Sequence, residues 1–321
     1  MIQQSSRFPT AVIVVPGGLN YFYDLVGRRL AETLRGLGWE PRLRTARELD
    51  GEEGDLAILC NVSEVVLAGG GAAAEAAVRA LRGRVDRVAS LGIDCVATPW
   101  YARLVELSGR LGADVVVDLG LFPQDAAADQ SPRYRFLFSG LTPDELRTLD
   151  RLGDDLGERP IPWAFVGHLT EARAGLVDDL VRQVHPGGFV YMPNLAPYVE
   201  EDSPHLNQRQ FEGVLSRSVY QVWCSHHEHF YLEPERFRTS LLTGGAPLKV
   251  VRPGFEPPAA APFAEFLVRW DELRRATTLD PAAAVALYRR RWRAMPTLGD
   301  GLAELLAELD LGARPPLARA G

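Results

Sequence analysis

Lysine and cysteine are the chemically reactive residues that this sequence has least of. Lys249 is the only lysine, so a lysine-based phosphate loop or a Schiff base is excluded at every other position. The three cysteines, Cys60, Cys95 and Cys224, are widely spaced and include no C-x-x-C pair. This pattern rules out a disulfide framework and a cysteine-based zinc site, and it fits a reducing compartment.

Positive charge and long apolar runs are lacking as well. The chain carries a formal net charge of −7, which argues against a general nucleic-acid binder because such proteins usually present a basic face. No apolar run approaches the roughly 20 residues that a membrane helix needs, and the polar start does not resemble a signal peptide. We therefore expect a cytoplasmic protein with no nucleic-acid partner and no membrane span.

The first part of the chain alternates short apolar runs with helical patterns. The run AVIVV at 11–15 is rich in β-branched residues and ends at a Pro-Gly-Gly turn, which is typical of a buried parallel strand. A helical pattern follows, and further strands are expected at 39–44, 55–60, 87–93 and 113–118. This alternation predicts an α/β domain with a doubly wound, Rossmann-like sheet over residues 1–140.

The rest of the chain repeats this organisation. Residues 141–160 are rich in charge, glycine and proline and are expected to form a linker. A second Rossmann-like domain is expected over 161–280, with strands at 162–166, 189–192, 219–224 and 248–251. Residues 281–321 are predicted to be mainly helical and to pack back across the junction between the two domains.

Two features of the first domain fit a ligand site. Gly17, Gly18 and Asn20 follow the first strand, and ligands of open α/β sheets bind beyond the carboxyl ends of strands. The two glycines let a ligand approach the next helix, although a simple tight turn explains them equally well. Asp94 follows another strand and is a candidate base, although carboxylates at strand ends are common.

The segment FVGHLTEAR, residues 165–173, carries the most information in the second domain. A strand ends at Gly167, His168 follows, and Arg173 falls in the first turn of the next helix. A guanidinium group binds a phosphate in a bidentate manner, and a helix N-terminus adds partial positive charge. This arrangement favours a phosphate site, with a solvated surface arginine as the alternative.

A second group of cations begins the helix at 235–242. Arg236 and Arg238 lie near its N-terminus, where a helix disfavours positive charge, so the pattern indicates either a bound anion or salt bridges to Glu233 or Glu235. Gly244 and Gly245 close this helix. Three histidines at 226–229 are close in sequence, but their spacing implies no metal site.

The two α/β domains, the linker and the closing helices resemble a glycosyltransferase of the GT-B class, in which two Rossmann-like domains face a cleft. FVGHLTEARAG resembles the "FVGRL…KG" element of retaining nucleotide-sugar transferases. RFRTSLLTGGAPLKVV resembles their "R-x-F-E-A-L-A-C-G-x-P-L-I" element. The nearest group is that of the spore-maturation-protein-like glycosyltransferases, and the resemblance covers about residues 160–310.

The resemblance implies a donor site in the second domain. The residues that align with the family's donor-site positions are Gly167, His168, Arg173, Arg236, Arg238, Gly244 and Gly245. The glutamate that holds the donor ribose in the family is replaced by Thr239 or Ser240, depending on the alignment. Glu228, Glu233 or Glu235 could take over that role from the preceding residues.

The function implied is transfer of a sugar from a nucleoside-diphosphate sugar to an acceptor, without a metal or a cofactor. His168 would be a proton donor or a polar contact, Asp94 the acceptor-side base, and the acceptor would lie near Gly17, Gly18 and Asn20. Two alternatives stay open. One is a degenerate transferase that binds a nucleotide or a partner without chemistry, and the other is a nucleotide-sugar epimerase.

Overall fold

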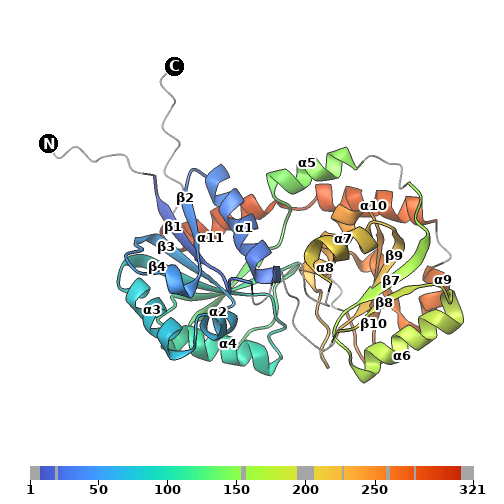
Figure 1. The fold of residues 1–321 in the computed structure, drawn as a ribbon, viewed down its shortest axis with the longest axis horizontal. Helices are drawn as coiled ribbons and strands as arrows, with labels where there is room; N and C mark the ends of the chain where they lie inside the picture. Colours follow the sequence, from blue (N-terminus) through green and yellow to red (C-terminus); the bar gives the residue numbers. More distant parts are fainter. Residues whose placement is uncertain are drawn as a thin grey trace, which may run out of the picture. The chain divides into compact units, whose positions relative to one another are not determined.

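The computed structural model describes residues 8–18, 21–152, 157–193, 206–225, 228–257, 261–277 and 280–311. The chain forms two compact units (Figure 1). Unit 1 combines the chain up to Leu119 with Pro123–Thr142 and the residues from Pro296 onward. Unit 2 combines Gly120–Phe122 with Pro143–Met295. Among the described residues, no helix is both long and apolar enough to span a bilayer.

Unit 1 is built on a six-stranded sheet with the order β2-β1-β3-β4-β5-β6. The pairs β1–β2, β1–β3, β3–β4 and β4–β5 are all parallel. The strands are β1 (Thr10–Val14), β2 (Glu40–Arg44), β3 (Gly54–Cys60), β4 (Val85–Gly92), β5 (Val115–Gly120) and β6 (Arg133–Phe138). The central strands are apolar along their length because helices cover both faces of the sheet.

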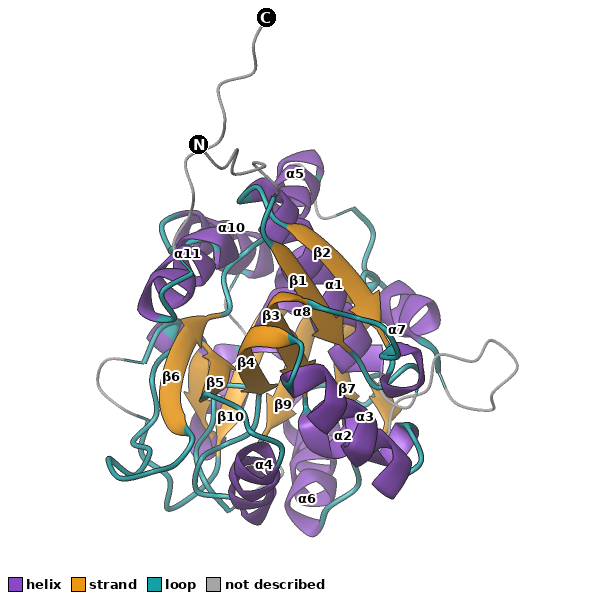
Figure 2. Ribbon diagram, turned by 90° about the vertical axis from the view of Figure 1, so that its left-hand side faces the viewer, coloured by secondary structure: helices purple, strands orange, loops and turns teal. Residues whose placement is uncertain are grey.

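Two hydrophobic clusters cover the two faces of this sheet. Apolar side chains of α1 (Tyr21–Gly36) pack on one face, together with those of the last helix, α11 (Leu298–Glu308). The helices α2 (Val62–Ala68), α3 (Ala72–Arg82) and α4 (Pro99–Arg110) pack on the other face (Figure 2). A short 3-10 helix, Ala46–Glu48, joins β2 to β3. Unit 1 is therefore a three-layer α/β/α unit.

Unit 2 is built on a five-stranded sheet with the order β11-β10-β9-β7-β8, in which all four pairs are parallel. The strands are β7 (Ile161–Val166), β8 (Phe189–Tyr191), β9 (Ser218–Cys224), β10 (Ala246–Val251) and β11 (Leu267–Arg269). The helices are α5 (Pro143–Arg151), α6 (Glu171–Asp179, continued to Val184 as a π-helix), α7 (Gln208–Leu215), α8 (Pro234–Thr243), α9 (Leu273–Ala276) and α10 (Pro281–Arg293), with 3-10 turns at Ala264–Phe266 and Trp270–Glu272.

Both sheets place their strands in the same order relative to the chain: second, first, third, fourth, fifth. Such sheets reverse direction between the first and third strands, and ligands bind at the carboxyl ends of the strands at that switch point. The switch points are β1/β3 in unit 1 and β7/β9 in unit 2. The prediction of two Rossmann-like parallel sheets is confirmed, and helix α5 occupies part of the segment 141–160 that we expected as a linker.

Candidate functional site

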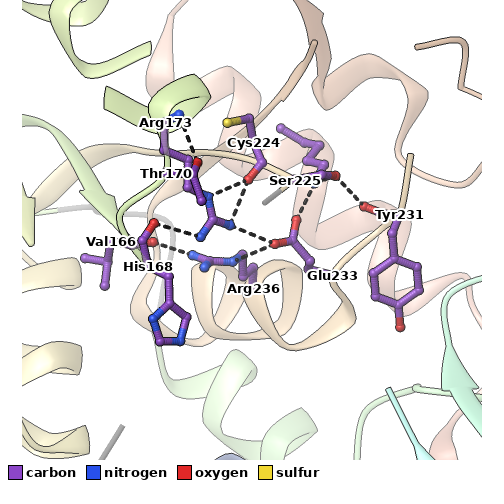
Figure 3. A network of polar contacts seen from close by, with 10 residues as sticks. Val166, His168, Thr170, Arg173, Cys224, Ser225, Tyr231, Glu233 and Arg236 are labelled. Atoms are coloured by element: carbon purple, nitrogen blue, oxygen red, sulfur yellow. Dashed lines mark hydrogen bonds and ion pairs between the residues drawn. The ribbon is translucent and has the colours of Figure 1, made fainter. Parts of the chain in front are cut away.

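The switch point of unit 2 brings the ends of β7 and β9 together. Gly167 and His168 follow β7, and Cys224 and Ser225 end β9. The N-terminus of α6 follows the first strand closely, and α8 begins after the second. Side chains from both helices and from β10 meet at this edge of the sheet (Figure 3).

Arg173 bridges the two strand ends. Thr170 caps α6 by accepting a hydrogen bond from the Arg173 N–H at 3.3 Å, which fixes the start of the helix. The guanidinium donates to the Cys224 carbonyl from Nε at 3.2 Å and Nη2 at 2.9 Å, and to the His168 carbonyl from Nη1 at 3.3 Å. The side chain is 1% exposed. Arg173 therefore links the two strand ends at the switch point. Because its side chain is buried, it would act on a ligand through its charge rather than by direct contact.

Arg236 lies beside Arg173 and is more accessible. Its Nη1 donates to the Val166 carbonyl at 2.6 Å, and its Nε donates to Glu233 Oε1 at 3.2 Å. Its side chain is 24% exposed. Arg236 is thus the guanidinium of this site that can contact a ligand from solvent.

Lys249 is a third cation of the site, and the sequence offered only a weak signal for it. It interrupts the apolar strand β10, is 1% exposed, and donates to Ser225 Oγ at 2.8 Å and to Glu233 Oε2. A lysine is rarely buried without a partner. A single lysine inside an apolar strand therefore indicates a buried ion pair. The sequence analysis did not draw this inference for Lys249.

Glu233 forms an ion pair with all three of these cations. Burial alone would raise its pKa, but Lys249, Arg236 and Arg173 lower the pKa to about 2. Burial also lowers the pKa of Arg173 to about 10, with the Arg236 charge adding to the effect. We call Arg173, Glu233, Arg236 and Lys249 the cation cluster. Its three positive charges exceed its one negative charge, so the cluster favours an anionic ligand.

Gly167 leaves room for the two guanidinium groups. A Cβ atom at this position would lie 2.8 Å from Arg173 Nη1 and 3.1 Å from Arg236 Nη2. The glycine that the sequence marked as a site residue is therefore needed for packing against both arginines. His168 follows it, and its side chain is exposed. Partial desolvation lowers the pKa of His168, and the charges of Arg173 and Arg236 add to the effect. The shift favours the neutral imidazole, which suits a polar contact.

Several other residues expected at the donor site lie elsewhere. Arg238 is buried and is paired with Glu235 at 2.6 Å and with Glu145 of α5 at 2.9 Å. Gly244 and Gly245 end α8 at the opposite edge of the sheet, roughly 16 Å along β10 from the level of Cys224. Gly244 has a φ of +71°, so it serves as a left-handed helix cap.

The hydroxyl and carboxyl residues considered for the donor ribose are also dispersed. The Ser240 hydroxyl donates to the Gly245 carbonyl at 3.2 Å, and the Thr239 carbonyl accepts from Thr243, so both take part in the end of α8. Glu228 is exposed. His226 and His227 are outside the described residues, and the described part of the chain contains no group of His, Cys, Asp and Glu side chains that could hold a metal ion.

The glycine turn of unit 1 does not present free backbone donors to a ligand. The N–H groups of Gly17 and Gly18 donate to the two carboxylate oxygens of Asp24, at 3.1 and 2.8 Å. The expectation that these glycines contact a substrate stays a prediction, in which they would allow close approach rather than donate hydrogen bonds. Asn20 is outside the described residues.

A carboxyl network that the sequence only hinted at lies at the ends of β4 and β5. Asp118, 2% exposed, accepts at Oδ2 from Tyr134 Oη at 2.8 Å and from Gln124 Nε2 at 3.1 Å. The same Gln124 amide donates to the Asp94 carbonyl at 3.3 Å. Burial raises the pKa of Asp94 to about 6, and burial together with the Asp94 charge raises that of Asp118 to about 7. Asp94, predicted as a base, thus lies beside a second carboxyl.

These raised pKa values predict how stability depends on pH. A carboxyl whose pKa is higher in the folded state keeps its proton there longer, so its contribution to stability is lost as pH rises through about 4 to 7. Asp118→Asn should flatten this decline, measured by urea unfolding between pH 4.5 and 7.5. Asp129→Asn, at an exposed position of the connection that follows β5, should leave the decline in stability intact. An unchanged slope in Asp118→Asn would contradict the assignment.

Comparison with known proteins supports the fold and little more. No family model and no curated protein matches the sequence. An α-glucosyltransferase in complex with UDP and a 13-mer DNA containing an HMU base superposes with a TM-score of 0.63 at 13% identity. An α-glucosyltransferase in complex with UDP has a TM-score of 0.58 at 10% identity. Both matches cover 95% of this chain and 100% of the other. The chain therefore has a GT-B-like glycosyltransferase fold.

Proposed function

We propose that this chain is a glycosyltransferase that moves a sugar from a nucleoside-diphosphate sugar to an acceptor hydroxyl. The observation that carries the proposal is the cation cluster at the β7/β9 switch point, where a sheet of this order binds its ligand. The likeness in fold to α-glucosyltransferases in complex with UDP supports the same proposal. We also propose that the chain belongs with the spore-maturation-protein-like glycosyltransferases, which its sequence motifs resemble.

The chemical task of the cation cluster is to stabilise the leaving nucleoside diphosphate. Arg236 contacts the diphosphate, while Arg173 and Lys249 contribute positive charge from buried positions. The N-termini of α6 and α8 open at the same edge and add partial positive charge. Fixed cations and dipoles of this kind stabilise a developing anion without reorganisation of solvent. His168 supplies a neutral polar contact.

The acceptor is activated on unit 1. The acceptor oxygen forms a bond to the anomeric carbon, the bond from that carbon to the diphosphate oxygen breaks, and the acceptor proton passes to Asp94. A base with a pKa of about 6 is ionised at neutral pH and still takes up a proton readily, which suits this role. The charge of Asp94 raises the pKa of Asp118 in turn.

The experiment measures thermal unfolding of the wild-type protein with a panel of nucleosides, monophosphates, diphosphates and nucleotide sugars. A diphosphate at about 100 times its Kd should add about 2.7 kcal/mol of stability, and the matching nucleoside much less. Release of the diphosphate from a nucleotide sugar is then followed by chromatography. If no diphosphate stabilises the protein, the proposal is wrong. Binding without release indicates a nucleotide-binding protein, and release with a free sugar epimer indicates an epimerase.

A further inference from the structure

Unit 1 carries one acidic residue at the carboxyl end of each of four neighbouring strands. In sheet order, Asp24 follows β1, Glu64 follows β3, Asp94 follows β4, and Asp118 lies at the end of β5. These residues lie within electrostatic range of shared neighbours. Asp94 and Glu64 both raise the pKa of Tyr23, Asp94 raises that of Asp118, and Asp24 raises that of Cys60. We call these four residues the acidic edge.

From this edge, and on the basis of the proposed function, we propose that the acceptor is a non-anionic carbohydrate, held by the acidic edge and by the indole of Trp100. Its hydroxyl groups would donate hydrogen bonds to the carboxyl groups, and the C–H face of its ring would pack on the indole. Phosphorylated sugars, uronic acids and nucleic acids would be rejected.

The first argument is an unsatisfied carboxyl oxygen. Asp118 is 2% exposed, and its Oδ1 is buried with no hydrogen-bond partner among the described residues, while Oδ2 accepts two hydrogen bonds. A buried polar atom without a partner is costly, and such atoms in native proteins are often ligand sites. Gln124 and Tyr134 fix the carboxyl in place, so this oxygen is held ready for a donor such as a ligand hydroxyl.

The second argument is charge. Within the described part of the chain, no cation lowers the pKa of Asp94 or Asp118, and the N–H donors that hold Asp24 are neutral backbone groups. Arg44, at the end of the neighbouring strand β2, is paired with Glu52 at 2.6 Å. An anionic acceptor would therefore meet the negative charge of Asp94 and Asp118, whereas hydroxyl or ammonium groups would be attracted.

The third argument is an exposed aromatic side chain in the same connection as Asp94. Trp100 is 60% exposed in the first turn of α4, six residues after Asp94, and α4 begins at the carboxyl edge of the sheet. A flat apolar surface beside fixed polar groups is the usual composition of a small-molecule site. It matches a sugar ring, which has an apolar C–H face and a rim of hydroxyl groups.

The test uses saturation-transfer NMR on the full chain with three matched probes: methyl β-D-glucoside, glucosamine and glucose 6-phosphate, together with a 13-mer DNA duplex. Each probe is measured with and without the nucleoside diphosphate that stabilises the protein most. We expect signal from the neutral and the amino sugar and at least tenfold less from glucose 6-phosphate. The DNA duplex should give none.

Two variants locate the binding. Trp100→Ala is expected to weaken binding of the glucoside at least fivefold without changing the diphosphate Kd. Leu67→Ala, at another strongly exposed apolar position of unit 1, should change neither. Equal binding of glucose 6-phosphate or DNA, absence of binding by both sugars, or an unaffected Trp100→Ala would each overturn the inference. None of these results would affect the nucleotide-binding test, so the two proposals fail separately.

Discussion

Replacing Arg238 with methionine is expected to lower the free energy of unfolding by about 3–5 kcal/mol. The guanidinium is buried between Glu235 of its own helix and Glu145 of α5, with N–O distances of 2.6 and 2.9 Å. Burial alone would lower the pKa of Arg238, but the two carboxylates raise it, so the group stays charged. Without it, two buried carboxylates lose the guanidinium that both of them contact.

The measurement is urea unfolding of the wild type and of Arg238→Met at pH 7. The triple variant Arg238→Met, Glu235→Gln, Glu145→Gln removes all three charges and should recover a large part of the loss, because the cost comes from uncompensated carboxylates. Arg236→Met, two residues away on a more exposed side of α8, provides the comparison and should lose much less stability. A loss below 1 kcal/mol for Arg238→Met would show that the ion pairs carry little energy.

Replacing Arg236 with glutamine is expected to weaken binding of a nucleoside diphosphate by about 10- to 150-fold. This range corresponds to the loss of one hydrogen bond between charged groups, about 1.5–3 kcal/mol. Arg236 is the member of the cation cluster with an accessible guanidinium, and its contacts to Val166 and Glu233 orient it at the switch point.

Isothermal titration calorimetry measures this change directly. Arg182→Gln removes an exposed arginine of the same unit, at 71% exposure and away from the cluster, and should leave the Kd unchanged. Increasing salt should reduce the difference between wild type and Arg236→Gln, because the exposed part of the interaction is screened. Wild-type affinity in Arg236→Gln would remove the cation cluster from the donor site.

The fold could be predicted because most of its strands have a clear pattern in the sequence. Runs such as AVIVV and LAILC are apolar throughout, which marks strands that helices cover on both faces, and glycines or proline follow several of the strands. Short elements were missed. The helix α5 has a charged, polar composition that looks like a linker, and only its packing against α8 makes it part of unit 2.

The candidate site could be predicted only where its residues are adjacent in sequence. Gly167, His168 and Arg173 come from one segment, and the structure brings them to one edge. Arg236 and Arg238 seemed equivalent by sequence, yet residues two apart on a helix face different sides, so one meets Arg173 and the other meets α5.

Pairings between distant strands carry no local signal. Lys249 with Glu233 joins two different elements, and Asp118 becomes notable only when Tyr134 and Gln124 close around it. The glycines at 244 and 245 have the composition of a ligand loop, but the length of α8 places them at the wrong end.

The membership of α11 in unit 1 has a consequence for how the protein is made. Leu298, Leu302, Leu305, Leu306 and Leu309 belong to the same hydrophobic cluster as the first strands, although the whole of 143–295 separates them along the chain. During synthesis, the ribosome completes the chain of unit 2 before the residues that close the core of unit 1 emerge. Unit 1, whose synthesis begins first, therefore completes its folding last. Until α11 emerges, one face of its sheet is incompletely covered. During that period the exposed apolar face is open to binding by a chaperone or to aggregation with another chain.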